Sequence, residues 1–151
     1  AGGIAGWRHR VVGEPVGDFV YQKGYNQAQK NRDTIFMMGA ELPYYDKVPN
    51  WLSEHVMTSE RARVAAWRGI GAGYTKFAVE SMLDELATER KQDPFEFRLA
   101  LSSDLRVRRL LERVRDMSEW SRKRSGTALG MSFIEYGVAA PKFGSMCASV
   151  A

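Results

Sequence analysis

The hydrophobic pattern is most regular between residues 74 and 90. Val79, Met82, Leu83 and Leu86 recur at helical spacing, and most of the charged residues fall on the opposite side. Apolar residues spaced in this way form the buried stripe of an amphipathic helix. The pattern therefore predicts one long helix over residues 74–90.

Alternating apolar and polar positions predict several strands. The alternation favours strands at residues 4–12, 52–58 and 128–136, and the last residues, 145–151, look like the start of another. A short apolar run at residues 64–67 leads into a glycine-rich motif that precedes the long helix. The expected order in this part of the chain is therefore strand, glycine loop, helix.

Two further helices are expected after the long one. Asp93, followed by a proline and then by Glu96, has the composition of a helix start. A second apolar stripe predicts a helix over residues 104–120. Residues 16–38 show only weak periodicity and are expected to form an irregular excursion with room for one short helix. Together with the strands, these elements predict an α+β fold.

The glycine-rich motif, residues 67–73, offers candidate binding chemistry. Gly69, Gly71 and Gly73 stand at alternate positions, where a missing Cβ lets the backbone approach a ligand. The start of the following helix favours an anion, and Arg68 adds a planar cation suited to phosphate or carboxylate. The same pattern also describes a tight turn into a core helix, so both interpretations stay open.

Known catalytic and nucleotide-binding signatures are absent from the sequence. Tyr74 stands where the dinucleotide fingerprint needs its third glycine, and there is no Gly-Lys-Ser/Thr sequence for a phosphate loop. Glu80 and Asp84 share one helix face, but helix carboxylates are usually solvated, and we expect the same here. The residues by themselves indicate no self-contained active site.

Composition narrows the classes of partner. The 22 basic and 18 acidic residues are interspersed, and no basic stripe with stacking aromatic residues is present, so we expect no nucleic-acid partner. No run of 18 apolar residues occurs, so no membrane span is expected. The single cysteine, Cys147, excludes an internal disulfide and a multi-cysteine metal site, and is uninformative about the compartment.

Three stretches carry a resemblance to a known family. Residues 66–71 (Ala-Trp-Arg-Gly-Ile-Gly), 77–87 (Phe-Ala-Val-Glu-Ser-Met-Leu-Asp-Glu-Leu-Ala) and 93–98 (Asp-Pro-Phe-Glu-Phe-Arg) resemble the molybdenum-binding large subunit of the xanthine dehydrogenase/aldehyde oxidase family. Residues 6–13 and 42–44 are similar to the isoquinoline 1-oxidoreductase β-subunit branch of that family. The resemblance covers nearly the whole chain, but such subunits are several times longer, so it implies an interior portion.

The resemblance implies a function and a set of residues. The enzymes of this family oxidise aldehydes or N-heterocycles with water as the oxygen source, using a molybdopterin-type molybdenum cofactor. Arg68 matches the arginine of the family's cofactor motif, and Gly69 and Gly71 lie beside it, so the resemblance implies that these three bind the cofactor. Ile70 occupies the place of a substrate-packing phenylalanine in xanthine oxidase-like members, which implies a substrate contact but leaves the substrate open.

The resemblance also implies partners and a division of the chain. The partners are the remainder of the molybdenum subunit and an iron–sulfur small subunit. Residues 1–120 are expected to belong to the first molybdopterin-binding subdomain, residues 121–127 to a linker and residues 128–151 to the start of the next subdomain.

The isolated chain is expected to be inactive, because the family's catalytic glutamate and its glutamine-bearing cofactor loop have no counterpart in the sequence. Two other functions stay open: a non-catalytic phosphate- or nucleotide-binding module, and a structural or assembly element.

Overall fold

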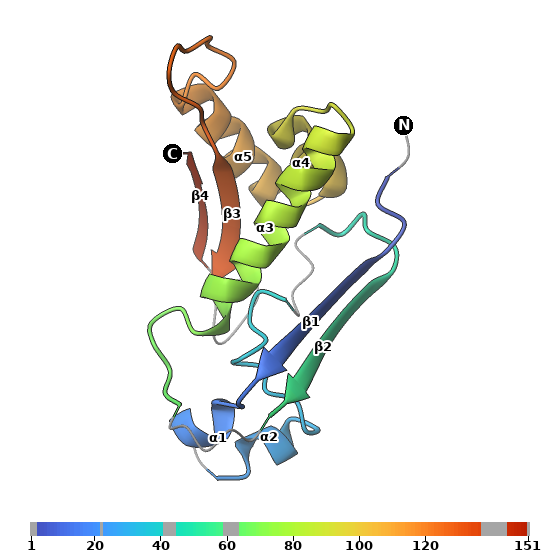
Figure 1. Cartoon of the computed structure of the whole chain (residues 1–151), viewed down its shortest axis with the longest axis vertical. Helices are drawn as coiled ribbons and strands as arrows, with labels where there is room; N and C mark the ends of the chain where they lie inside the picture. Colours follow the sequence, from blue (N-terminus) through green and yellow to red (C-terminus); the bar gives the residue numbers. More distant parts are fainter. Residues whose placement is uncertain (1–2, 22, 41–44, 59–63, 137–144, 151) are drawn as a thin grey trace.

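The computed structural model describes residues 3–21, 23–40, 45–58, 64–136 and 145–150. It contains both helices and strands, which confirms the predicted α+β class (Figure 1). The elements are β1 (Trp7–Gly13), α1 (Gly17–Val20), α2 (Tyr25–Ala28), β2 (Trp51–Met57), α3 (Gly71–Glu89), α4 (Pro94–Leu101), α5 (Leu105–Met117), β3 (Met131–Tyr136) and β4 (Ser145–Val150).

The strands form two separate pairs in the part of the chain that the structure describes. β1 and β2 are parallel, in a register that runs from Trp7 opposite Trp51 to Gly13 opposite Met57. β3 and β4 are antiparallel. All four strands were expected, each within a few residues of its observed bounds, but the apolar run at residues 64–67 has no regular structure.

The excursion between β1 and β2 is more helical than its sequence indicates. It contains two helices of four residues each, α1 and α2, where room for one was expected. Both lie beyond the carboxyl ends of β1 and β2 (Figure 1). A parallel pair needs such a crossover connection, because the chain must return to the starting end of the sheet before the second strand begins.

The three long helices follow the predicted order. α3 begins at Gly71, so the helix starts three residues earlier than its apolar stripe indicates. α4 is capped as predicted, because the Asp93 carboxylate accepts hydrogen bonds from the N–H groups of Phe95 at 2.9 Å and Glu96 at 3.1 Å. α5 ends at Met117, three residues before its predicted end.

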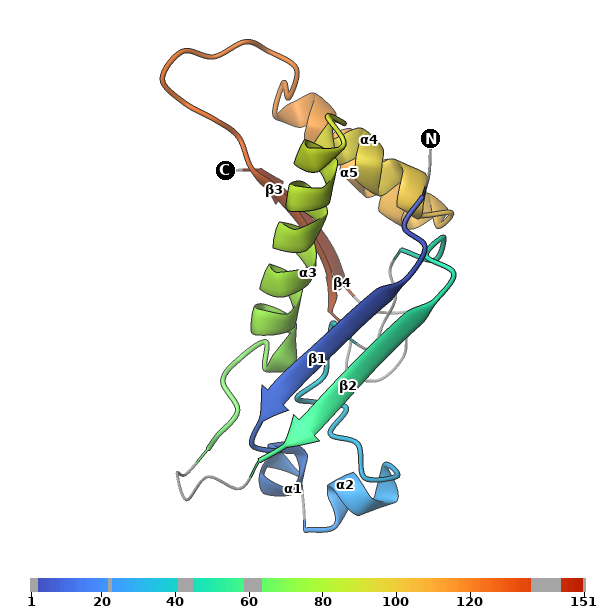
Figure 2. The same cartoon turned by 45° about the vertical axis from the view of Figure 1, so that its right-hand side comes forward.

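α3 is the central element of the fold. Both α4 and β3 pack against it, and the β1–β2 pair crosses on its other side (Figure 2). One hydrophobic core joins residues of α3, α4, α5 and β3 with residues that precede β1 and β2. Its buried members are Ile4, Tyr45, Val48, Val79, Leu83, Ala87, Phe95, Phe97, Leu99, Leu101, Val107, Leu111, Met131 and Phe133.

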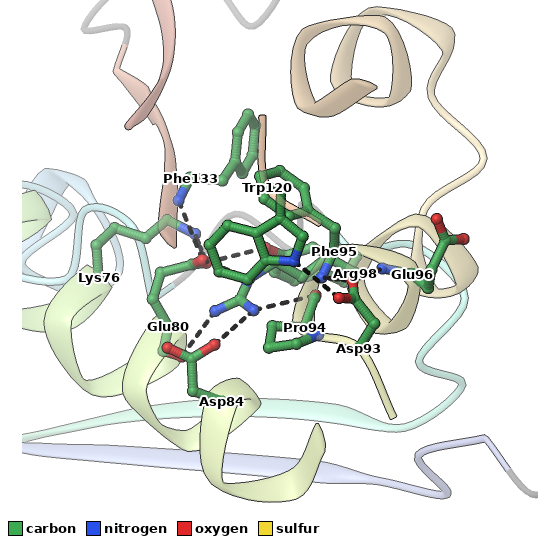
Figure 3. A network of polar contacts seen from close by, with 11 residues as sticks. Lys76, Glu80, Asp84, Asp93, Pro94, Phe95, Glu96, Arg98, Trp120 and Phe133 are labelled. Atoms are coloured by element: carbon green, nitrogen blue, oxygen red, sulfur yellow. Dashed lines mark hydrogen bonds and ion pairs between the residues drawn. The ribbon is translucent and has the colours of Figure 1, made fainter. Parts of the chain in front are cut away.

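A buried charge pair lies at the centre of these contacts. Arg98 of α4 is fully buried, and its Nε donates to Glu80 Oε2 on α3 at 2.9 Å (Figure 3). The same carboxylate accepts from the hydroxyl of Tyr45 at 2.9 Å and from the backbone N–H of Phe133 in β3 at 3.0 Å. Arg98 also donates to Asp84 at 2.7 Å. The expectation of solvated carboxylates is therefore wrong for Glu80, which bonds two helices, a loop and a strand together.

The side chain of Lys76 completes this charged cluster. It is buried, and its Nζ lies 3.9 Å from Glu80 Oε1 and over the rings of Tyr45 and Phe133. Burial lowers the pKa of Lys76 to about 8, although Glu80 acts in the opposite direction. Burial and the nearby Glu80 carboxylate raise the pKa of Tyr45 well above its usual value. Because these groups are desolvated, they depend on one another for their charge state.

Replacing one member of the pair tests this dependence. We expect Arg98→Met to lower the free energy of unfolding by about 3–5 kcal/mol, because the buried Glu80 carboxylate loses its hydrogen-bonded guanidinium and, among the described residues, keeps only the cation of Lys76, at 3.9 Å. The double variant Glu80→Met/Arg98→Met should recover only part of that loss, since the paired charges are removed but the buried Lys76 loses its neighbouring carboxylate. Urea unfolding followed by tryptophan fluorescence measures both. An Arg98→Met loss below about 1 kcal/mol, the range of an exposed ion pair, would contradict a central role.

Candidate functional site

The glycine motif forms the turn that leads into α3. Gly69 has φ +95°, a left-handed conformation that favours glycine. The turn is closed by backbone bonds from the N–H of Ile70 to Trp67 O at 2.9 Å and from the N–H of Ala72 to Gly69 O at 3.0 Å. A Cβ added at Gly69 would meet no atom within 4 Å. Glycine at this position is therefore required by the backbone conformation, and the space beside it is open.

Ile70 is the strained residue of the turn. Its φ is +42°, a conformation that a β-branched side chain rarely adopts because Cβ crowds the backbone. Strain of this kind costs on the order of 1–3 kcal/mol and is concentrated at functional sites. The side chain is half-buried and lines a cleft at this end of the molecule. The position implied for a substrate contact is thus the one at which the backbone is under strain.

Gly71 has a different requirement from Gly69. It lies in the first turn of α3, and a Cβ added there would sit 2.1 Å from Phe36 O and 2.7 Å from Ile35 O. Glycine at 71 therefore allows the helix start to pack directly on the backbone of residues 35 and 36. This contact also explains why α3 begins before its apolar stripe, because packing fixes the first turn.

A loop segment, residues 33–40, supports the start of α3. The hydroxyl of Tyr74 donates to Phe36 O at 2.6 Å, and that of Thr75 donates to Met38 O at 2.6 Å. Gly39, with φ +88°, brings the segment so close that a Cβ there would lie 2.5 Å from Thr75 Oγ1. The first two turns of α3 are therefore attached to the backbone of this supporting segment by side-chain hydrogen bonds and by close packing.

Asp33 holds the supporting segment in shape. Its buried carboxylate accepts four backbone N–H groups: those of Val16 at 2.5 Å, Gly17 at 2.7 Å, Ile35 at 3.1 Å and Phe36 at 2.8 Å. Two of these donors belong to the start of α1, and two belong to the turn whose carbonyls contact Gly71. Sequence reasoning missed Asp33, whose only signal is a short polar residue in a turn-like stretch.

The candidate cleft opens between the end of β1, the motif and the start of α3. Its volume is about 620 Å³. Arg68 lines it and is exposed, and the neighbouring Trp67 is 87% exposed. Phe36 and Tyr74 form part of the opposite wall, where the Phe36 ring also stacks on His55 at 4.2 Å between centroids. Among the described residues, the lining of the cleft therefore combines aromatic side chains with the cation of Arg68.

This arrangement fits an anionic ligand that also has an aromatic part. Gly73 lines the cleft and its open backbone would admit close approach, and the Arg68 guanidinium suits a phosphate oxygen; Gly69 also has open space beside it but does not line the cleft. The N–H groups of Ala72 and Gly73 already bond to chain carbonyls, which leaves less of the helix start for an anion than the sequence indicates. Among the described residues, no three His, Cys, Asp or Glu side chains gather as metal ligands.

The described helices include none that is long and apolar enough to cross a membrane.

Comparison with known proteins supports the family resemblance. The chain is 38% identical, over 138 residues, to the isoquinoline 1-oxidoreductase subunit beta of Brevundimonas diminuta. The similarity covers 88% of this chain but only 17% of that relative. No protein-family model matches the chain. The chain is thus similar, over most of its length, to a small part of a much longer oxidoreductase subunit.

The role of Asp33 can be tested without a ligand. We expect Asp33→Asn to weaken the support of the motif by about 1–3 kcal/mol, because an amide cannot accept all four backbone N–H groups. Hydrogen exchange should then become faster in residues 33–40 and 64–74. Asp46→Asn is the matched control, since Asp46 is exposed and accepts from Ser103 far from the motif. Equal effects of the two variants on residues 64–74 would contradict the supporting role.

Proposed function

We propose that this chain is a segment of the large subunit of a molybdenum hydroxylase of the xanthine dehydrogenase/aldehyde oxidase family. The observation that carries the proposal is its 38% identity, over 88% of its length, to the isoquinoline 1-oxidoreductase subunit beta. The position of the motif adds support, because residues 67–70 form a turn, exposed at Trp67 and Arg68, beside a cleft at the start of a long helix.

In this proposal the motif binds part of a molybdopterin-type cofactor. Arg68 bonds an anionic group of the pterin, while Gly69 allows the backbone to lie close to it. Gly71 acts indirectly, by letting the start of α3 pack against Phe36 and so fixing the position of the turn. Ile70 forms part of the wall that faces the substrate. When bound, the cofactor supplies the redox chemistry that hydroxylates an aldehyde or N-heterocycle with oxygen from water.

The remainder of the large subunit and an iron–sulfur subunit are the proposed partners. The chain spans 17% of the relative's length, so the rest of the cofactor site would come from other parts of the polypeptide. We therefore propose that the isolated chain has no oxidoreductase activity. Oxidation of an aldehyde or N-heterocycle by the purified chain with added cofactor would contradict this proposal. The division into subdomains at residues 121–127 stays a prediction.

Substitutions at Gly69 distinguish two reasons for glycine at this position: close approach of the cofactor and the left-handed backbone conformation. We expect Gly69→Val to reduce the molybdenum content of the complete subunit more than Arg68→Lys does, because valine both fills the open space and disfavours a positive φ. Gly69→Asn is the matched variant, since asparagine tolerates left-handed conformations but still adds a Cβ. Loss of molybdenum in both variants supports close approach of the cofactor.

The outcomes divide the possible roles of the motif. Molybdenum loss in Gly69→Val alone indicates a purely conformational role, and full molybdenum content with normal activity in both variants shows that the motif is only a turn. Ile70→Phe should leave the molybdenum content nearly unchanged and shift the ratio of kcat/KM between aldehyde and N-heterocycle substrates. Binding of simple nucleotides by the isolated chain would instead favour a phosphate-binding module.

A further inference from the structure

The edge of β1 that faces away from β2 has no strand beside it among the described residues. The N–H of Trp7 donates to Asn50 O at 2.7 Å, and Gly13 O accepts from the N–H of Thr58 at 3.1 Å. In a parallel ladder this places the backbone groups of the odd-numbered residues of β1 toward β2. The backbone N–H and C=O groups of Arg8, Arg10 and Val12 therefore point to the opposite edge, where they can pair with another strand.

A groove of about 450 Å³ runs between β1 and α3. One wall is the continuous stretch of residues 4–9, which leads into β1 and includes its first residues. The other wall comes from Ala78, Met82, Leu86 and Arg90, which are spaced every four residues and so form one stripe along α3. Met82 is 46% exposed, although its spacing marks it as part of the apolar stripe. The groove thus has a strand on one side and a mostly apolar helix face on the other.

Two buried polar atoms belong to residues that line the groove. Trp7 Nε1 and His9 Nδ1 are buried from solvent, yet neither has a hydrogen-bond partner among the described residues. Buried polar groups in folded proteins nearly always have such partners.

The groove is continuous with the hydrophobic core. Trp7 and Leu86 line the groove and also pack against the core cluster. A segment that filled the groove would therefore extend the core of this same fold. Parallel sheets are normally larger than two strands and have both faces covered. Because the chain spans 17% of its relative's length, a polypeptide of that length has most of its residues outside this chain.

We propose that an extended segment of the same polypeptide, from outside residues 1–151, lies in this groove as a third strand. It pairs with the backbone of Arg8, Arg10 and Val12, and its inward side chains cover the apolar stripe of α3. This inference rests on the proposed function, because it requires the chain to be part of a longer subunit.

Photo-cross-linking in the complete subunit identifies what covers the groove. Met82 and, separately, Ala78 are replaced by p-benzoylphenylalanine, and the cross-linked peptides are identified by mass spectrometry. Met117 of α5, which is 70% exposed, is the matched control position. We expect the two groove positions to cross-link to one segment of the same polypeptide outside residues 1–151. Cross-linking to a second copy or to another subunit, or to nothing beyond the Met117 background, would overturn the proposal.

Hydrogen exchange with residue resolution tests the pairing itself. In the complete subunit, the amides of Arg8, Arg10 and Val12 should exchange about a hundredfold or more slowly than unprotected amides, as in paired core strands. Free exchange at these three positions, with slow exchange at His9 and Val11, would show an unpaired edge and overturn the proposal. The molybdenum content of the same preparation tests the proposed function independently. A molybdenum-loaded subunit without the cross-link contradicts only the third strand, whereas a same-chain cross-link without molybdenum contradicts only the cofactor role.

Discussion

The fold depends on the buried pair formed by Arg98 and Glu80. A carboxylate and a guanidinium removed from water cost several kcal/mol each unless every polar atom finds a partner. Here the partners come from α3, α4, the loop around Tyr45 and the first residues of β3, so the charges can be satisfied only when all four are in place. The pair therefore defines one arrangement of these elements, which hydrophobic contacts alone would leave less specific.

The candidate site depends on a second buried carboxylate, that of Asp33. It organises residues 33–36, and the carbonyls of Ile35 and Phe36 form the surface on which Gly71 packs. Because α3 starts on this surface, the exposed turn at Arg68 to Ile70 is held at a fixed place by residues more than thirty positions earlier in the chain. The turn can thus be strained at Ile70 and still occupy one position.

Local sequence patterns predict most of the helices and strands. The features that the sequence does not predict depend mostly on contacts between residues far apart in the chain. The strands and the cap at Asp93 depend on alternation and on neighbouring residues, so they can be inferred from the sequence. The burial of Glu80 depends on Arg98, eighteen residues away on another helix, and helical spacing carries no sign of it. The motif glycines look alike in the sequence, whereas Gly69 is required by its own φ and Gly71 by a carbonyl from the supporting segment.

The parallel register of β1 and β2 has a consequence for how the chain folds. Because residues 14–50 separate the two strands, their hydrogen bonds can form only after the intervening chain has closed into a loop. Such non-local pairing slows folding, and until it is complete both strands expose unpaired backbone and apolar side chains. The α3–α4 pair, which is joined by a short turn, can form much sooner. A polypeptide that contains this segment would therefore pass through a stage in which its helices are formed while the strands beside the candidate site are still open to aggregation.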